Sequence, residues 1–252
     1  MNRFEGKVAL VTGAGSQRGI GRATALALAR EGARIAITDV AADGVKQVVA
    51  ELNEISQAIG EVADVRNKEQ MVQVVKRIVA EFGGVDILVN NAGLTRPTSF
   101  LAITEEEYDL VVDVNLKGTF LTTQAVVPAM LERGGGAIVS LSSVSGQRGG
   151  GVFGSSHYSA AKAGIMGLTK ALARELSPQG IRVNCVAPSM IDTDIAGDLL
   201  TAERKIELAK GSLLGRLGTV DDVAKSILFL ASDESAYLTG ATLDINGGMH
   251  LH

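Results

Sequence analysis

The sequence is poor in the residues that mark several classes of protein. It has no tryptophan, only 4% aromatic residues and a single cysteine, Cys185, among 252 residues. One cysteine excludes an intrachain disulfide and a zinc site built from cysteines. We expect Cys185 to be a small apolar residue within a strand. Two of the three histidines, His250 and His252, lie in the tail without other clustered ligands, so no metal site is expected.

Long hydrophobic runs and strong charge are also missing. No apolar run approaches the ~18 residues of a membrane-spanning helix, and the first residues contain no signal-peptide core. The net charge is −4, from 24 basic and 28 acidic residues, and no basic run points to a nucleic-acid surface. We therefore expect a cytoplasmic, soluble protein without a membrane or nucleic-acid partner.

Short β-branched runs alternate with longer helical patterns throughout the chain. The predicted strands are residues 7–12, 34–39, 61–65, 85–90, 137–142, 182–187 and 242–245. The predicted helices are residues 19–31, 43–56, 68–82, 105–133 and 158–177. This alternation indicates an α/β fold, with a parallel sheet covered by helices on both faces. Residues 1–252 show no linker or repeat, so a single domain is expected.

Two stretches interrupt the alternation. Residues 146–157 are rich in glycine, and residues 189–217 form a long insertion with a helical pattern at 203–210. Both follow predicted strand ends, where open α/β sheets bind their ligands. Long irregular segments in compact domains are often functional, and we interpret 189–217 as a substrate lid.

A glycine-rich turn links the first predicted strand to the first predicted helix. Such a turn lets the backbone approach a pyrophosphate, and the following helix offers free amide donors and the positive end of its dipole. The setting between strand and helix predicts a dinucleotide site. The expected contacts in this turn are Gly13, Ser16, Arg18, Gly19, Ile20 and Gly21.

Two residues bear on the choice of coenzyme. Asp39 ends the second predicted strand, where a carboxylate can accept both ribose hydroxyls of NAD and repels the 2′-phosphate of NADP. Arg18 lies within the glycine turn, and a guanidinium there can reach a 2′-phosphate. Direct repulsion by Asp39 is the stronger effect. The sequence therefore predicts NAD, with NADP as the alternative.

Tyr158 and Lys162 are four residues apart in a predicted helix, so they share one face. A free tyrosine has a pKa of about 10 and is a poor acid or base near neutrality. A positive charge nearby favours the phenolate and lowers that pKa. An isolated pair of this kind is usually a surface feature of a helix. Downstream of a dinucleotide turn, it predicts a general acid/base.

With these residues placed, the chain resembles the short-chain dehydrogenase/reductase family along nearly its whole length. The matching motifs are Thr12-Gly13, Gly19-Ile-Gly21, Asp64-Val65, Asn90-Asn91-Ala92-Gly93, Asn115, Ser143, Tyr158, Lys162, Asn184 and Pro188. The resemblance implies a three-layer Rossmann-type fold with a doubly wound, seven-stranded parallel sheet. It also implies a homotetramer, with residues 105–133, 158–177 and 243–248 at its interfaces.

The resemblance further implies a catalytic tetrad. Tyr158 exchanges a proton with the substrate oxygen, and Lys162 lowers the pKa of Tyr158 and binds the nicotinamide ribose. Ser143 holds the substrate oxygen, with Ser142 and Ser145 as competitors for that role, and Asn115 positions a water. The other implied contacts are Asp64 and Val65 at the adenine, Asn91, Ala92 and Gly93 at the ribose, and Pro188, Ile191 and Thr193 at the nicotinamide end.

Three departures from the family pattern are visible. Five residues separate Gly13 from Gly19, where the family usually has three, and we expect the extra pair to bulge outward. The spacing from Ser143 to Tyr158 is slightly long, which the glycine-rich loop can absorb. Ser189 stands where a glycine is usual, and we expect it to stiffen the start of the lid or to add a hydrogen bond.

These residues favour an NAD-dependent oxidoreductase that acts on a small secondary alcohol, diol or polyol, or on the matching ketone. The alternative is an NADPH-dependent 3-oxoacyl-thioester reductase that binds an acyl carrier protein. Asp39 argues against that alternative, as does Gln179 where a basic residue would help to dock the carrier, whereas Arg18 argues for it. A non-catalytic nucleotide-binding scaffold is a distant third, because no tetrad residue is lost.

Overall fold

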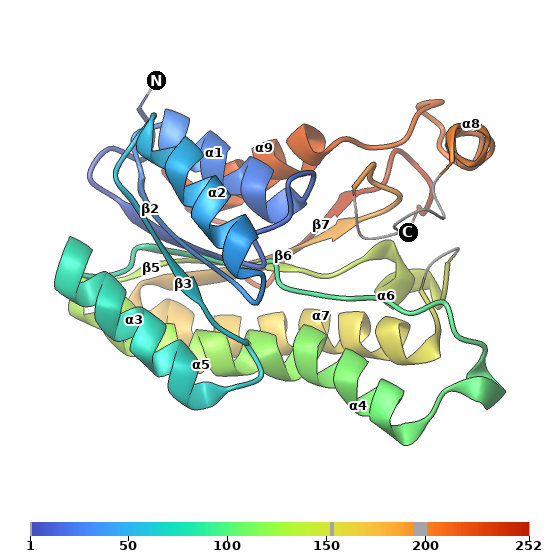
Figure 1. Cartoon of the computed structure of the whole chain (residues 1–252), viewed down its shortest axis with the longest axis horizontal. Coiled ribbons are helices and arrows are strands. Elements are labelled where there is room, and N and C mark those ends of the chain that lie inside the picture. Colours follow the sequence, from blue (N-terminus) through green and yellow to red (C-terminus); the bar gives the residue numbers. More distant parts are fainter. Residues whose placement is uncertain (1, 152–153, 194–200, 252) are drawn as a thin grey trace.

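One parallel sheet forms the centre of the molecule. The computed structural model describes residues 2–151, 154–193 and 201–251. Seven strands pair in the order β3-β2-β1-β4-β5-β6-β7, all parallel (Figure 1). Their bounds are β1 Val8–Thr12, β2 Arg34–Asp39, β3 Ala58–Val62, β4 Ile87–Asn90, β5 Gly136–Leu141, β6 Ile181–Pro188 and β7 Thr242–Ile245. The sheet confirms the fold expected from the sequence.

Helices cover both faces of this sheet, which gives three layers (Figure 1). One face carries α1 (Ile20–Arg30), α2 (Ala42–Asn53) and α9 (Val220–Ala231). The other carries α3 (Lys68–Phe82), α4 (Glu105–Val112), α5 (Gly118–Glu132) and α7 (Ser156–Leu176). Two short helices, α6 (Val144–Arg148) and α8 (Ala202–Ala209), lie beyond the carboxyl ends of the strands.

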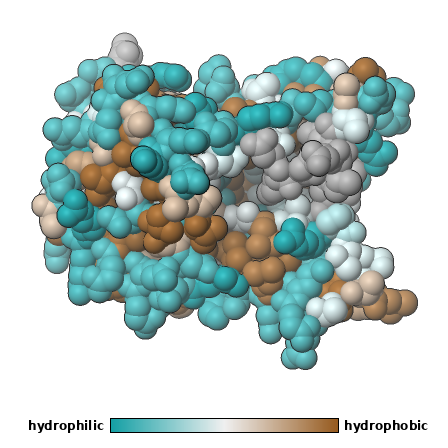
Figure 2. All heavy atoms as spheres, viewed as in Figure 1, coloured by the Kyte–Doolittle hydropathy of each residue, from teal (hydrophilic) through white to brown (hydrophobic). Residues whose placement is uncertain are grey.

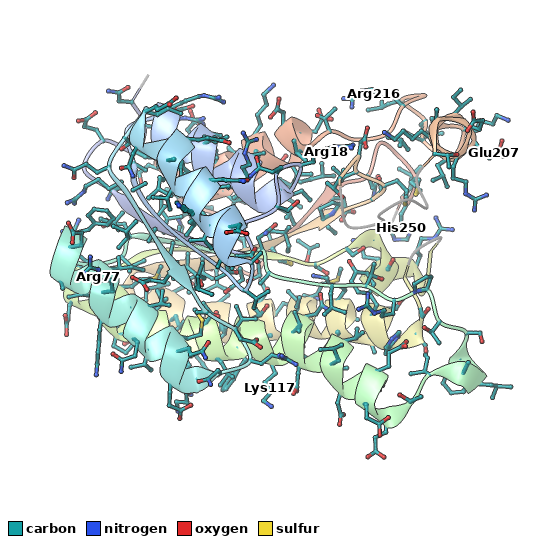
Figure 3. The ribbon with its side chains drawn as sticks, in the orientation of Figure 1. Arg18, Arg77, Lys117, Glu207, Arg216 and His250 are labelled. Carbon is teal, nitrogen blue, oxygen red and sulfur yellow. The ribbon has the colours of Figure 1, made fainter. Side chains whose placement is uncertain are left out.

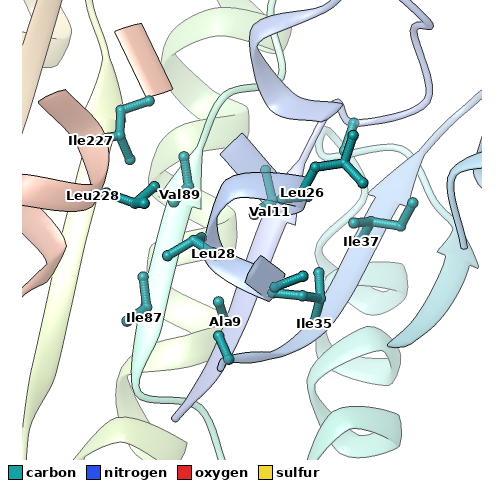
Figure 4. Packing of buried hydrophobic residues seen from close by; sticks show 14 of the residues in the cluster. Ala9, Val11, Leu26, Leu28, Ile35, Ile37, Ile87, Val89, Ile227 and Leu228 are labelled. Atoms are coloured by element: carbon teal, nitrogen blue, oxygen red, sulfur yellow. The ribbon is translucent and has the colours of Figure 1, made fainter. Parts of the chain in front are cut away.

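The central strands are apolar along their length because both of their faces are buried. Val11 and Val89 belong to a core cluster shared with α1 and α9 (Figure 4), whereas Leu10 and Leu88 belong to a second cluster under α3 and α5. All four side chains have no exposed surface. The sheet is therefore a rigid platform for the loops at its carboxyl edge.

The third strand lies earlier in the chain than the sequence pattern predicts. We expected a strand at residues 61–65, but β3 covers Ala58–Val62 and pairs with β2 from Ile35↔Ala58 to Asp39↔Val62. β3 is an edge strand, and Val62 is 56% exposed. An edge strand needs no continuous apolar run, and β3 contains Gly60 and Glu61, which are uncommon in strands, so the pattern is weak. Figure 2 shows hydrophobic atoms along this edge, between the two helix layers.

The segment predicted as one helix at 105–133 consists of three parts. A π-helical turn, Asp113–Lys117, lies between α4 and α5. Its hydrogen bonds run one residue further than in an α-helix, and such turns are often found at functional sites. The sequence pattern did not reveal it.

Two helices were not placed by the sequence pattern. α6 begins at Val144, directly after β5, and α9 covers Val220–Ala231. A signal for α9 is present, because Thr219 and Asp222 form a capping box ahead of an apolar face. In the expected lid, α8 is close to the predicted helix at 203–210, and residues 194–200 lie outside the described part of the chain. Among the described helices, none combines the length and apolarity needed to cross a bilayer.

Candidate active site

A cleft of about 900 Å³ lies at the carboxyl ends of the strands. Its lining includes residues that follow β1 and β4, where the strand order reverses and doubly wound sheets bind nucleotides. The predicted site residues that line it are Gly13, Ser16, Gly19, Ile20, Asp39, Asn91, Gly93, Asn115, Ser143, Tyr158, Lys162, Pro188, Ile191 and Thr193. The predicted residues not in this lining are Arg18, Gly21, Asp64, Val65 and Ala92.

The segment after β4 supports the glycine turn through hydrogen bonds and close packing. The Asn91 amide donates to the carbonyl oxygens of Thr12 (2.9 Å) and Gly13 (2.7 Å). A Cβ on Gly21 would lie 2.5 Å from the Asn91 amide nitrogen, and one on Gly13 would lie 2.6 Å from the Cα of Ala92. Gly21 and Ala92 therefore shape the turn without lining the cleft.

The two additional residues of the turn bulge away from this support, as expected. The Gly19 N–H donates to the Ser16 carbonyl at 3.3 Å, which closes the bulge. Gln17 and Arg18 are exposed, and the Gln17 amide donates to the side chain of Gln47 on α2 at 3.0 Å. The inner part of the turn keeps its shape although the loop is longer.

Asp39 lines the cleft at the end of β2. Its Oδ2 accepts the Gly15 N–H at 2.8 Å, and its Oδ1 accepts the Ala41 N–H at 3.0 Å. These bonds hold the carboxylate against the glycine turn. Because each carboxylate oxygen can accept more than one hydrogen bond, Asp39 retains capacity for ribose hydroxyls.

Three of the four residues after β5 are serines, and the structure separates their roles. The Ser142 hydroxyl donates to the Lys162 carbonyl at 2.7 Å and so ties β5 to α7. Ser143 is hydrogen-bonded to Tyr158 and caps α6 by accepting the Ser145 N–H at 3.1 Å. Ser145 lines the cleft further along. Ser143 is therefore the serine beside the phenol.

Tyr158 and Lys162 lie next to each other, and Tyr158 also contacts Ser143. Lys162 is only 4% exposed, donates to the Leu141 carbonyl at 2.7 Å and lies 5.6 Å from the centre of the Tyr158 ring. Burial lowers the pKa of Lys162 to about 7. Desolvation raises the pKa of Tyr158 to about 12, and the hydrogen bond with Ser143 opposes this rise. The sequence predicts a lowered pKa for Tyr158; in the structure, burial has the larger effect.

Asn115 enters the site from the π-helical turn. Its amide nitrogen donates to the carbonyls of Leu94 and Val111, both at 2.8 Å. Its Oδ1 is buried and has no hydrogen-bond partner among the described residues. A Cβ on Gly93 would lie 2.7 Å from this oxygen and 3.4 Å from the Lys162 nitrogen. Glycine thus leaves room between an acceptor and an amine, a setting that suits a bridging water.

The predicted adenine contacts lie beside the cleft. Asp64 is paired with Arg66 at 2.6 Å, and hydrogen bonds from Arg66 hold the pKa of Asp64 below its usual range. Val65 is buried against Gly118. Their contact with an adenine ring stays a prediction.

The nicotinamide end is built on the segment after β6. The Ser189 N–H donates to the Ile245 carbonyl at 3.1 Å, which extends the pairing of β6 with β7. No described residue other than glycine has a positive φ, so Ser189 is tolerated without backbone strain. Thr193 is buried, and Ile191 forms a β-bridge with Gly218. Cys185 lies on β6 with no exposed surface, as expected.

The substrate end of the cleft was only partly visible in the sequence. The glycine-rich loop does line it, and the Gly150 N–H donates to the Ser159 hydroxyl oxygen at 2.8 Å, which accommodates the longer spacing between Ser143 and Tyr158. Five further lining residues come from the predicted lid at 189–217, namely Met190, Arg204, Leu208, Lys210 and Gly211, whereas Met249 carries no motif and was missed. In the described part of the chain, no three potential metal ligands come together.

These features fit a nicotinamide dinucleotide. The glycine turn provides close backbone approach, the Asp39 carboxylate faces the cleft from β2, and Lys162 and Asn115 lie at its other end. Tyr158 and Ser143 lie together where a substrate oxygen would have to reach. The arrangement provides a proton donor, a hydroxyl partner and a buried amine within one cleft.

Comparisons with known proteins agree with this geometry. Residues 13–250 match a family model described as enoyl-(acyl carrier protein) reductase. The chain is 49% identical over 251 residues to an uncharacterised short-chain type dehydrogenase/reductase of Sinorhizobium fredii, covering 99% of each protein. It is 44% identical over 248 residues to a 3-oxoacyl-[acyl-carrier-protein] reductase of Thermotoga maritima, covering 98% of this chain and 99% of that protein.

A solved structure of a short-chain type dehydrogenase/reductase from Mycobacterium marinum superimposes with a TM-score of 0.93 at 36% identity, covering 99% of this chain and 97% of that one. The motifs, the sheet order and these similarities agree. The chain belongs to the short-chain dehydrogenase/reductase family, whose members are oxidoreductases that use a nicotinamide coenzyme.

Proposed function

We propose that the protein is an NAD(H)-dependent oxidoreductase that interconverts a secondary alcohol, diol or polyol and its ketone. The observation that carries the coenzyme choice is the Asp39 carboxylate, which faces the cleft at the end of β2 and is anchored by Gly15 and Ala41. A fixed negative charge there favours ribose hydroxyls and repels a 2′-phosphate.

The chain's own residues supply acid–base chemistry and placement. A bound nicotinamide coenzyme supplies or accepts the hydride. Tyr158 donates a proton to the ketone oxygen in reduction and removes it from the alcohol in oxidation. Ser143, hydrogen-bonded to Tyr158, holds the same oxygen and stabilises charge that develops on it. Lys162 lies 5.6 Å from the centre of the Tyr158 ring, and its protonated form favours the phenolate.

Asn115 completes this arrangement by holding water. Its buried Oδ1 and the Lys162 amine both border the space beside Gly93. In this proposal, a water held there accepts from the amine, donates to Oδ1 and connects the buried pair to solvent. The π-helical turn keeps the side chain in this position through its bonds to Leu94 and Val111.

A second candidate is the reduction of a 3-oxoacyl thioester with NADPH. The observation in its favour is the similarity to the Thermotoga maritima 3-oxoacyl-[acyl-carrier-protein] reductase over nearly the whole chain. The two candidates share the same hydroxyl/carbonyl chemistry at Tyr158. They differ in coenzyme and in the group attached to the reacting carbon.

Equilibrium titration with NADH and with NADPH separates the two coenzyme choices. The readout is coenzyme fluorescence or heat, because the protein has no tryptophan to act as a donor. We expect tighter binding of NADH. Activity is then measured with a panel of secondary alcohols, diols and polyols, and with 3-oxoacyl thioesters. Tighter NADPH binding together with turnover of the thioesters alone would favour the second candidate.

Asp39→Asn tests the carboxylate directly. We expect NADH to bind more weakly and NADPH more tightly, because the negative charge is lost while the size of the side chain is kept. Loss of a charge-assisted hydrogen bond is worth about 1.5–3 kcal/mol, or roughly 10- to 150-fold in the ratio of affinities. The matched control is Asp43→Asn, a nearby acid in the first turn of α2. An equal change in both variants would show that overall charge, rather than Asp39, sets the preference.

We also propose a homotetramer, with α4, α5, α7 and the region of β7 at the interfaces. Exposed apolar residues on two of these helices support this, since Tyr108 on α4 is 46% exposed and Phe120 on α5 is 43% exposed. Light scattering should give about four times the chain mass of 26.1 kDa. Phe120→Glu should reduce that mass. A monomer in the unmodified protein would contradict the proposal.

A further inference from the structure

Arg18 links the glycine turn to the opposite side of the cleft. Its guanidinium donates from Nη2 to Asp192 Oδ1 at 2.7 Å. Asp192 follows β6, and 174 positions separate the two residues in the sequence. The second oxygen of the same carboxylate accepts a hydrogen bond from Lys205 on α8, also at 2.7 Å. Arg18, Asp192 and Lys205 thus form a row of alternating charges, which connects the glycine turn, the segment after β6 and α8.

The direction of this contact matters for the coenzyme. Arg18 lies at the edge of the α1–α2 layer that faces the α8 region (Figure 3). Asp39 ends β2, whereas Asp192 follows β6, and these strands are four positions apart in the sheet order β2-β1-β4-β5-β6. At about 4.8 Å per strand, the ends of β2 and β6 are separated by roughly 19 Å. Asp192 follows the end of β6 and also contacts Lys205 on α8, so its contact with Arg18 directs the guanidinium towards the β6 and α8 side of the cleft.

A guanidinium paired with a carboxylate has to give up that contact before it can bind a phosphate. Arg18 and Asp192 have exposed fractions of 59% and 36%, so their ion pair is partly screened by water. Exposed pairs of this kind change an equilibrium constant by about two- to fivefold. Binding of a 2′-phosphate by Arg18 thus includes the loss of this contact, whereas recognition of the ribose hydroxyls by Asp39 does not.

We propose that Asp192 is a coenzyme-selectivity residue, which disfavours NADP by holding Arg18 away from the ribose 2′ position. This inference rests on the proposed nicotinamide site. In this proposal, two carboxylates favour NAD over NADP. Asp39 does so by contact with the ribose, whereas Asp192 acts through Arg18. Asp192 is therefore a positioning residue for the coenzyme, and its loss removes one restraint on Arg18, the only arginine within the glycine turn.

The test is a binding measurement on the full chain, without turnover. NADH and NADPH are titrated by calorimetry against the unmodified protein and Asp192→Asn, Arg18→Gln and the double variant. We expect Asp192→Asn to tighten NADPH binding about two- to fivefold and to leave NADH binding nearly unchanged. In the Arg18→Gln background, the same substitution should have no effect on NADPH, because the group that Asp192 restrains is gone.

A charge control comes from the same cleft. Glu207 lines it from α8 and is paired with Lys210 at 2.7 Å, so Glu207→Gln removes one negative charge without touching the Arg18 contact. We expect this variant to leave the ratio of NADPH to NADH affinity unchanged. Thermal unfolding of each variant without coenzyme establishes that the fold is kept.

Two results would overturn the inference. One is an equal change in NADH and NADPH affinity in Asp192→Asn, which would mean a general effect of charge. The other is the same gain in NADPH affinity with and without Arg18, which would mean direct repulsion by Asp192. Neither result depends on which coenzyme the unmodified protein prefers. The proposed NAD preference and the role of Asp192 are therefore tested separately.

Discussion

Replacing Tyr158 by phenylalanine should reduce turnover by a factor of about 10² to 10⁴, the usual contribution of a positioned general acid or base. The substitution keeps the ring that packs beside Lys162 and removes only the hydroxyl that Ser143 contacts. Coenzyme binding should persist, because the glycine turn and Asp39 are unaltered. Turnover is measured in both directions with the best substrate of the panel, and coenzyme binding by calorimetry.

Tyr108→Phe is the matched control for this experiment. Tyr108 lies on α4, is 46% exposed and does not line the cleft, so the same atom is removed away from the chemistry. Its turnover should match that of the unmodified protein. Unchanged turnover in Tyr158→Phe would falsify the assignment of the general acid/base. Loss of coenzyme binding in that variant would instead indicate a damaged site.

Replacing Lys162 by methionine should change how the stability depends on pH. Burial lowers the pKa of Lys162 from 10.5 to about 7, so the unfolded chain binds more protons than the folded protein between these values. Lys162 therefore makes the unfolding free energy of the unmodified protein increase as the pH rises through this window. One such group contributes at most about 1.4 kcal/mol per pH unit.

The difference in unfolding free energy, Lys162→Met minus unmodified protein, should therefore fall by about 4 kcal/mol as the pH rises from 7 to 10. Urea denaturation followed by circular dichroism at several pH values measures it. Tyr158 is present in both proteins, so the effect on stability of its raised pKa, which begins near pH 10, cancels in this difference. Lys170→Met, on the exposed side of α7, controls for the loss of a lysine as such. A pH-independent difference for Lys162→Met would mean that the amine is not buried as described.

The sequence was sufficient for those parts of the site that depend on local spacing. Tyr158 and Lys162 share a helix face because they are four residues apart, and Asp39 ends a strand that is apolar and β-branched. The fold followed from the regular alternation of such strands with helices. These features are set by neighbouring residues, so a pattern in the chain can indicate them.

Other parts of the structure depend on contacts that no local pattern records. Arg18 and Asp192 come together only after the sheet has formed, because 174 positions separate them in the sequence. β3 is an edge strand that contains Gly60 and Glu61, residues that are uncommon in strands. The pKa of Tyr158 was misjudged because its desolvation comes from the folded cleft, whereas the sequence shows only the nearby charge.

The π-helical turn at Asp113–Lys117 has a consequence for the ways in which this chain can vary in length. A π turn holds one residue more than the α-helix around it, and each residue of an α-helix turns the chain by about 100°. Deleting one residue there would allow a regular helix, but it would rotate either Asn115 or the whole of α5 out of place. The number of residues in this stretch is therefore constrained by the site as well as the identity of Asn115.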